Sequence, residues 1–547
     1  MAPVHCILLL AFSVGELLQP PAPKAPPPAT KVQQQPAPKS DKMPMTDLAP
    51  AILIPNLCSV KYRITTDSPQ CQAYFDQGLG YFYSYVWMEA ARSFETAAKA
   101  DPNCPMAWWG LSRALERWGK SKQTDALKKA GELKDRASFR EQQLILARMQ
   151  EKGMVSGVGG ADARKAAAIK TLDTLLAIHD DDEEGWYARA QLTGGAGLFG
   201  GQVSSVPFYK ALLHVNPMHP GANHELLHFY ETFRRPALGW LYAEKYIESS
   251  PGIPHPFHMQ AHLATRLGRW DKTADRSAKA IQLEQEYHRV QGVLPRDDQQ
   301  YNHHLEILTV SLIHDGRFKE ALAARADAEK NNYEHWLPWF RLAVASRDWP
   351  AALKVVAHYK KTEKITASYM AAVVYLKQNL PARAGPEVEV LRQAYQDKKQ
   401  DRLLQDRLNE TQGVLLCQTG AADAGLKLLA KAVERTKDDY GHHAWGNGAY
   451  LMEIWGVAAL QAGKFDQAEE ALLEALAHDP GSACAALGLQ VLCESQGRTE
   501  EASRYAELAQ RSWKRADANC LAQELAAIRG NSVAKQTTVS SSIHGGE

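Results

Sequence analysis

The sequence has no excess of charge of either sign. Its 547 residues carry 63 lysines and arginines against 62 aspartates and glutamates, a formal net charge of +1. Duplex nucleic acid is bound largely through concentrated positive charge at the phosphates, so this balance argues against a nucleic-acid partner. The sequence also lacks an apolar run of about 18 residues, the length that a membrane-spanning helix needs. We therefore expect neither a nucleic-acid-binding protein nor one that spans a membrane once any leader is removed.

Cysteine is scarce as well, with eight residues in the whole chain. That number is too small for a fold held together mainly by disulfides. Six of the eight form two groups, one near each end of the chain: Cys58, Cys71 and Cys104, and Cys484, Cys493 and Cys520. Spacing alone leaves open whether the members of a group pair or remain free, buried thiols.

The two ends of the chain do not have the composition of a packed fold. Residues 1–18 contain a short apolar stretch followed by small residues, as in a secretory signal. Residues 19–56 are rich in proline, which predicts a disordered, extended tether. We expect an exported protein that is periplasmic or associated with the cell envelope, or a cytoplasmic one if the first segment is no signal. Residues 532–547 are polar and predict a disordered tail.

Small and large residues recur between these ends in a 34-residue frame. In residues 71–104, positions 8, 11, 20, 24, 27 and 32 are held by Gly78, Tyr81, Ala90, Phe94, Ala97 and Pro102. The frame returns from Ala449, where positions 8, 20, 27 and 32 are Gly456, Ala468, Ala475 and Pro480. Small residues let two helices approach closely, large ones fill the space between them, and proline ends the second helix.

This pattern closely resembles the tetratricopeptide repeat. The resemblance implies an all-α fold, a right-handed superhelical solenoid of helical hairpins, and a protein or peptide as partner. The oligomeric state stays open. The acidic run at residues 180–184 predicts a solvated turn. The frame divides the chain into N-terminal repeats (57–152), an irregular insertion with a degenerate repeat (153–219), histidine-rich repeats (220–335), degenerate repeats (336–448) and C-terminal repeats (449–531).

Histidine is concentrated in one part of the frame: eleven of the 19 histidines lie between residues 214 and 314. The unit that begins at Pro220 has histidines at positions 5 and 9 and a glutamate at 12, and the unit from Pro254 has histidines at 2, 5 and 9. The unit from Asn302 has histidines at 2 and 13 and a glutamate at 5. In order, these residues are His224, His228 and Glu231; His255, His258 and His262; and His303, His314 and Glu306.

Positions 5, 9 and 12 form one stripe on a helix. The resemblance implies that this stripe, with positions 2 and 13, faces the concave groove of the solenoid. A histidine pair four residues apart can hold one divalent ion, and a neighbouring helix can complete its ligands. We predict a transition-metal site (zinc, copper or iron) with ligands among His224, His228, Glu231, His258, His262 and His303. We assign His255, His303, Glu306 and His314 to a ligand-binding groove, which could hold a small polar ligand in place of the metal.

Two other functions fit the same residues. The histidines could be the recognition surface of a plain protein- or peptide-binding adaptor that holds no metal. Residues 224–228 also spell His-Glu-Leu-Leu-His, the zincin signature, in which Glu225 would activate a zinc-bound water. A metal-dependent hydrolase is the less favoured alternative, because the second histidine pair has no glutamate after its first histidine and the sequence shows no strand pattern. We therefore do not expect an enzyme.

A narrower resemblance covers about residues 66–351. The runs GANHELLHFYE, PFHMQAHLATRLGRW and NHHLEILTVSLIHDGRF resemble the motifs of a largely uncharacterised group of bacterial tetratricopeptide-repeat proteins. Two positions depart from the group's H-N-x-H motif: His304 replaces the asparagine and Glu306 replaces the second histidine. The group implies no activity, and a carboxylate at Glu306 would favour a harder ion.

Overall fold

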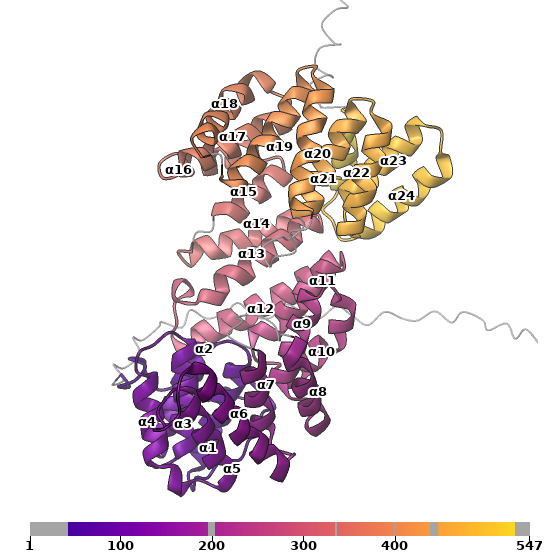
Figure 1. The fold of residues 1–547 in the computed structure, drawn as a ribbon. Coiled ribbons are helices and arrows are strands. Elements are labelled where there is room, and N and C mark those ends of the chain that lie inside the picture. Colours follow the sequence, from indigo (N-terminus) through magenta and orange to yellow (C-terminus); the bar gives the residue numbers. More distant parts are fainter. Residues whose placement is uncertain (1–41, 195–202, 334–335, 399, 438–446, 531–547) are drawn as a thin grey trace, which may run out of the picture. The chain divides into compact units, whose positions relative to one another are not determined.

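The computed structural model describes residues 42–194, 203–333, 336–398, 400–437 and 447–530. All regular secondary structure within these ranges is helical, with 25 α-helices and three short 3₁₀ helices. Consecutive helices pack against each other in pairs, and the first helices of successive pairs also touch, as α9 touches α11 and α21 touches α23 (Figure 1). This is the all-α solenoid of helical hairpins that the sequence predicts.

The N-terminal repeats and the region after them contain eight α-helices. They are α1 Pro69–Tyr83, α2 Trp87–Ala100, α3 Pro105–Arg117, α4 Gln123–Glu132, α5 Phe139–Glu151, α6 Ala161–Ile178, α7 Glu183–Gly194 and α8 Val206–Val215, with 3₁₀ helices Lys134–Arg136 and Val203–Ser205.

The histidine-rich repeats form the next six helices. They are α9 Pro220–Thr232, α10 Pro236–Ser249, α11 Pro254–Arg266, α12 Trp270–Gln291, α13 Gln299–His314 and α14 Phe318–Lys330, with a 3₁₀ helix at Pro295–Asp297.

The remaining repeats supply eleven helices. They are α15 Trp336–Ala345, α16 Trp349–Tyr359, α17 Lys364–Lys377, α18 Pro381–Asp397, α19 Arg402–Gln418, α20 Ala422–Thr436, α21 Asn447–Gln461, α22 Phe465–His478, α23 Ala483–Ser495, α24 Thr499–Ser512 and α25 Cys520–Ile528.

The close approach of helices rests on glycines that face one large side chain. Phe94 of α2 is buried between Gly78 of α1 and Gly110 of α3, where an added Cβ atom would lie 2.7 and 2.6 Å from the Phe94 ring. Leu472 of α22 lies in the same way between Gly456 and Gly488. Both clusters use equivalent positions of the 34-residue frame, so the two ends of the solenoid are packed by one rule.

Part of the predicted tether is ordered, which corrects the prediction for residues 42–56. Met43 and Ala51 are buried, and the backbone amides of Met45 and Thr46 donate to the Glu95 carboxylate at 2.6 and 2.8 Å. A buried acceptor on α2 thus fixes a segment that its proline content alone would leave extended. Residues 1–41 and 532–547, with the predicted signal, most of the tether and the tail, lie outside the described residues.

The region 153–219 is more regular than predicted, because α6, α7 and α8 account for most of its described residues. The alanine-rich run in α6 has high helix propensity even though it does not fit the repeat frame. The acidic turn before α7 is only partly solvated. Asp182 and Glu184 are buried, and Glu184 accepts a hydrogen bond from Arg113 at 2.6 Å.

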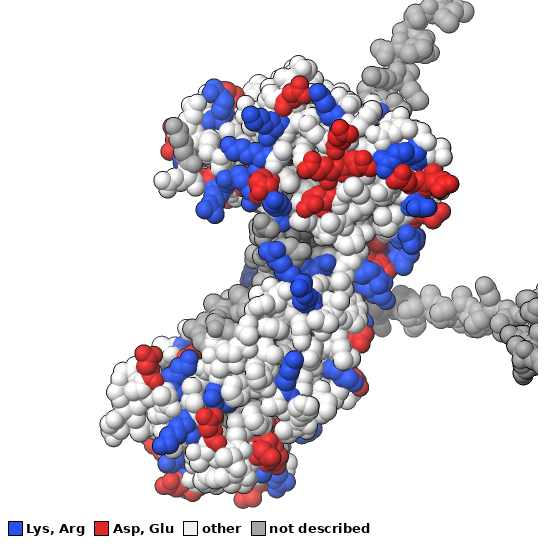
Figure 2. Space-filling model, turned by 45° about the vertical axis from the view of Figure 1, so that its right-hand side comes forward, with Lys and Arg blue, Asp and Glu red and all other residues white. Residues whose placement is uncertain are grey.

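The seven cysteines in the described part of the chain are free. Among the described residues, none of the helices combines the length and the apolarity that crossing a membrane would require. On the face shown in Figure 2, basic and acidic side chains are interspersed, in keeping with the near-zero net charge.

Candidate metal centre

Helix α9 presents the first histidine pair. His219 is its N-cap, where Nδ1 accepts a hydrogen bond from the Ala222 amide at 3.1 Å, and Pro220 occupies the first turn. His224 and His228 follow one turn apart on the same face, with their ring centroids 4.7 Å apart. Both rings are buried. The first pair therefore points into the protein and not toward solvent.

Helix α11 touches α9 and adds three histidines to the same space. His255 approaches α9, with its Nε2 atom 3.1 Å from Nε2 of His224. His258 and His262, one turn apart, bring their Nε2 atoms within 2.8 Å of each other. All three side chains are buried.

Helix α13 completes the group. The ring centroids of His303 and His304 lie 4.7 and 4.3 Å from that of His258. We refer to the resulting seven residues as the histidine cluster: His224, His228, His255, His258, His262, His303 and His304.

The histidine cluster contains three overlapping triads, in each of which one nitrogen per ring lies within 4.8 Å of the other two. They are His224/His228/His255, His255/His258/His304 and His258/His262/His303. Three imidazole nitrogens at such separations are a donor set that a transition metal can use.

Acceptors behind the rings hold three of these imidazoles. His224 donates from Nδ1 to the carbonyl oxygen of Tyr83 at 2.7 Å. His262 Nδ1 lies 3.0 Å from a Glu231 carboxylate oxygen, and His304 Nδ1 lies 2.7 Å from a Glu284 oxygen. When Nδ1 carries the proton, the lone pair of a neutral imidazole is on Nε2, which is the arrangement found behind metal-bound histidines.

Burial keeps His224, His255 and His258 neutral. It lowers the pKa of His224 to about 3, and repulsion from His262 acts in the same direction. Burial, reinforced by neighbouring imidazoles, also lowers the pKa of His255 and of His258 well below the usual value. Because metal binding needs the unprotonated ring, the cluster would not have to release protons from these residues at neutral pH.

The turn between α1 and α2 covers one end of the cluster, at His224, His228 and His255. Tyr85, with a positive φ of 60°, places its ring centroid 4.4 Å from that of His224 and stacks on His228 at 5.8 Å. Left-handed backbone at a non-glycine residue is costly and is often found at functional sites. The prediction of an open groove is therefore wrong for the six buried histidines of the cluster, whereas His303 is only partly buried. The first hairpin, which packs on α9, shields the end of the cluster nearest to it.

The structure brings six of the predicted histidines together and places Glu231 behind His262. Two predicted groove residues lie elsewhere. Glu306 is partly exposed, 3.9 Å from Arg341, and belongs to none of the triads. His314 stacks on Trp270 at 4.0 Å and lies 3.9 Å from Asp479.

His304 was not predicted as a ligand. It follows His303 directly, and neighbouring residues on a helix diverge by about 100°, so only one of the two could face an open groove. Both reach the cluster because it is enclosed, with Glu284 of α12 behind His304. The sequence signal was the doubled histidine itself, at the position where the bacterial motif has asparagine.

Glu225, the glutamate of the zincin-like segment, lies among tyrosines. Its Oε1 atom accepts hydrogen bonds from the hydroxyls of Tyr85 at 2.9 Å and Tyr187 at 3.4 Å, and from Gln191 at 3.3 Å. It belongs to none of the triads. A general base must reach the metal-bound water, so this arrangement gives the hydrolase alternative no support.

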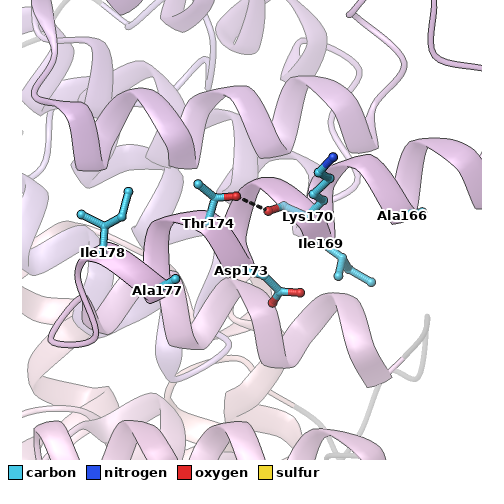
Figure 3. A pocket seen from close by; sticks show the side chains of 7 residues that line it. All are labelled: Ala166, Ile169, Lys170, Asp173, Thr174, Ala177 and Ile178. Carbon is cyan, nitrogen blue, oxygen red and sulfur yellow. Dashed lines mark hydrogen bonds between the residues drawn. The ribbon is translucent and has the colours of Figure 1, made fainter.

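A surface depression on α6 is separate from the cluster. It is lined by Ala166, Ile169, Lys170, Asp173, Thr174, Ala177 and Ile178, which follow one another along a single helix (Figure 3). The depression is open and mostly apolar, and it contains none of the predicted site residues.

The fold and the site together define a helical-repeat protein with a buried polyhistidine centre. Family models described as tetratricopeptide repeat match residues 75–122 and 459–512. The chain therefore contains tetratricopeptide repeats near both ends of its helical region. Such repeats present extended binding surfaces, and in coarse terms the chain is a protein-binding scaffold or adaptor.

Solved structures with some similarity include the P58(IPK) TPR domain, at 12% identity and a TM-score of 0.22, covering 81% of this chain and 99% of that one. The human IFIT1 dimer with m7Gppp-AAAA has 14% identity and a TM-score of 0.28, covering 82% and 91%. Similarity of this size does not extend to ligands or partners. No curated protein matches the sequence.

Proposed function

We propose that this protein is an exported tetratricopeptide-repeat scaffold that holds a divalent transition metal in its histidine cluster. The observation that carries the proposal is the set of three overlapping histidine triads on α9, α11 and α13. Export rests on the signal-like residues 1–18 and the proline-rich segment that follows them.

Burial favours a metal over a recognition surface for a peptide. Enclosed rings such as His224 and His262, which are 0% and 1% exposed, cannot contact a partner unless the hairpins separate. Burying polar ring nitrogens is costly unless each finds a partner, and an ion can serve several of them at once. The plain adaptor, in contrast, gives no reason for gathering six buried imidazoles in the interior.

The donor set limits the choice of ion. Imidazole nitrogen suits the predicted ions zinc, copper and iron, whereas calcium and magnesium prefer oxygen. Glu231 and Glu284 lie behind histidines, where an ionised carboxylate would partly offset the charge of a bound cation. Zinc, copper and iron therefore remain the candidates.

Metal analysis of the full chain, purified without a histidine tag, tests the proposal. We expect a bound transition metal in the wild-type protein and its loss in the double variant His224→Ala/His262→Ala. His214→Ala is the matched control, since His214 is exposed on α8, outside the cluster. A metal content that is unchanged in the double variant would show that neither His224 nor His262 holds the ion. A wild-type protein that takes up no metal would overturn the proposal and leave the plain adaptor as the function.

Export has its own test. We expect the protein to fractionate with the periplasm or the cell envelope of its host and to have a mature N-terminus downstream of residue 18. A full-length chain in the cytoplasmic fraction would contradict this part of the proposal without affecting the metal site.

A further inference from the structure

Two of the three histidine triads have no residue in common. One consists of His224 and His228 on α9 with His255 on α11 (the first triad). The other consists of His258 and His262 on α11 with His303 on α13 (the second triad). The remaining triad is made of His255, His258 and His304, so it takes one residue from each of the other two. The cluster thus has enough ligands for two separate sites.

Nitrogen–nitrogen distances group the rings in the same way. The Nε2 atoms of His224 and His255 are 3.1 Å apart within the first triad, and those of His258 and His262 are 2.8 Å apart within the second. Two imidazoles on one tetrahedral zinc ion, with Zn–N bonds of about 2.0–2.1 Å, have nitrogens about 3.3 Å apart. A shift of a few tenths of an ångström would therefore let each close pair share an ion.

Each of these triads also has its own orienting group. The Tyr83 carbonyl accepts from His224 in the first triad, and Glu231 lies at hydrogen-bond distance from His262 in the second. Outer-shell partners of this kind fix the tautomer and the ring orientation of a ligand. Since the two acceptors come from different helices, either triad could keep its geometry when the other is altered.

His304 lies between the two sites. Its ring centroid is 4.3 Å from that of His258 and 6.4 Å from that of His255. The ring is 1% exposed, and its Nε2 atom has no hydrogen-bond partner among the described residues. A buried nitrogen with a lone pair and no partner indicates a ligand at this place.

We propose that the histidine cluster is a two-ion centre, with one divalent transition-metal ion in the first triad, a second in the second triad, and His304 as a further ligand between them. This inference rests on the proposed metal-binding function and specifies its stoichiometry. The alternative is a single ion in the middle triad, which would leave His228 and His262 without a role as ligands.

Zinc stoichiometry separates the two arrangements. The full chain, purified without a histidine tag and stripped with a chelator, is dialysed against Zn²⁺ in the presence of a weak competing chelator, and bound zinc per chain is measured by mass spectrometry. A two-ion centre gives a ratio of two in the wild type, one in His228→Gln, one in His262→Gln and none in the double variant. Glutamine keeps the size of the ring approximately, and circular dichroism checks the fold of each variant.

Two controls exclude other sources of zinc. Cys71, Asp101 and Cys104 form a separate group of potential ligands on the first repeat, so Cys104→Ala must leave the ratio at two. His214→Ala, on the surface of α8, must do the same. A fall to one in either control would overturn the assignment of both ions to the histidine cluster.

The remaining outcomes are distinct. A wild-type ratio of one, unchanged in His228→Gln and in His262→Gln, overturns the two-ion inference and favours a single ion in the middle triad. A wild-type ratio of zero overturns the proposed function itself. The wild-type ratio needs no variant, so the inference can be refuted even if a substitution prevents folding.

Discussion

His219 offers a test of the local structure that presents the first histidine pair. Its Nδ1 atom accepts the hydrogen bond that caps α9, and its ring packs on Tyr83 with the centroids 4.7 Å apart. A protonated Nδ1 cannot accept, and burial lowers the pKa of His219 to about 3. Replacing it in His219→Asn keeps a side chain that caps helices well but removes the titrating group.

The magnitude follows from the pKa shift. Unfolded histidine has a pKa of about 6.5, so a folded-state pKa of about 3 means that the stability due to neutral His219 is complete above pH 6.5. It is lost as the pH falls from 6.5 toward 3. At pH 5 the unfolded ring is about 97% protonated while the folded ring is neutral. This difference lowers the free energy of opening by about 2 kcal/mol, which raises the equilibrium constant for opening about 30-fold.

Global unfolding of a long repeat array is not two-state, so the loss of stability has to be measured locally. Hydrogen exchange followed by mass spectrometry measures it within α9. We expect the protection of residues 220–232 in the wild type to fall about 30-fold more than in His219→Asn between pH 7.5 and pH 5. Comparing the two proteins at each pH cancels the intrinsic exchange rates and the titration of shared groups. Equal pH dependence in both proteins would refute the assignment of His219 as a neutral cap.

Three further predictions address the metal site, the helix packing and the ordered N-terminal segment. Glu231→Gln should weaken zinc binding about 10- to 100-fold, measured in competition with a chromophoric chelator, because the variant loses the carboxylate behind His262. Glu248→Gln, on the exposed face of α10, should leave zinc binding unchanged. Gly456→Ala should lower the free energy of unfolding by about 1–3 kcal/mol, because the new Cβ would lie 2.5 Å from Leu472. Gly385→Ala, with open space around it in α18, should raise the free energy of unfolding by about 0.5–1 kcal/mol. A melting temperature that moves the same way in both would contradict the packing argument. Glu95→Ala should destabilise the docked segment 42–56 by about 1–3 kcal/mol and expose it to limited proteolysis, since two backbone amides lose their acceptor. Unchanged cleavage of that segment would contradict the role of Glu95 in fixing it.

The enclosure of the histidine cluster changes what the repeats are expected to do. The tetratricopeptide resemblance implies a groove that meets partners, yet six of the seven histidines are buried, and Tyr85 of the first hairpin packs on His224 and His228. A metal held there would act as a structural or reactive centre inside the solenoid, and partner binding would fall to other surfaces. The two roles are therefore separable by mutation.

Much of the fold was readable from local periodicity. Glycine, phenylalanine and proline at fixed positions of a 34-residue frame predicted the hairpins, and the same positions pack Phe94 and Leu472 between glycines in the structure. The frame failed for α6, whose alanine-rich sequence forms a helix by propensity without the repeat pattern. It also failed for residues 42–56, which are fixed by an acceptor, Glu95, about 50 positions away.

The sequence by itself determined which histidines share a helix face, because a spacing of four residues is a property of a single helix. It also placed α9 and α11 side by side, since successive repeats are neighbours in any solenoid of this kind. Only the tertiary structure decided that the cluster is buried, that His304 joins it and that Glu306 does not. Those outcomes depend on contacts such as that of His224 with Tyr83, 141 residues earlier. Such contacts arise because the stacked hairpins bring the first pair of helices against the fifth, which no local pattern encodes.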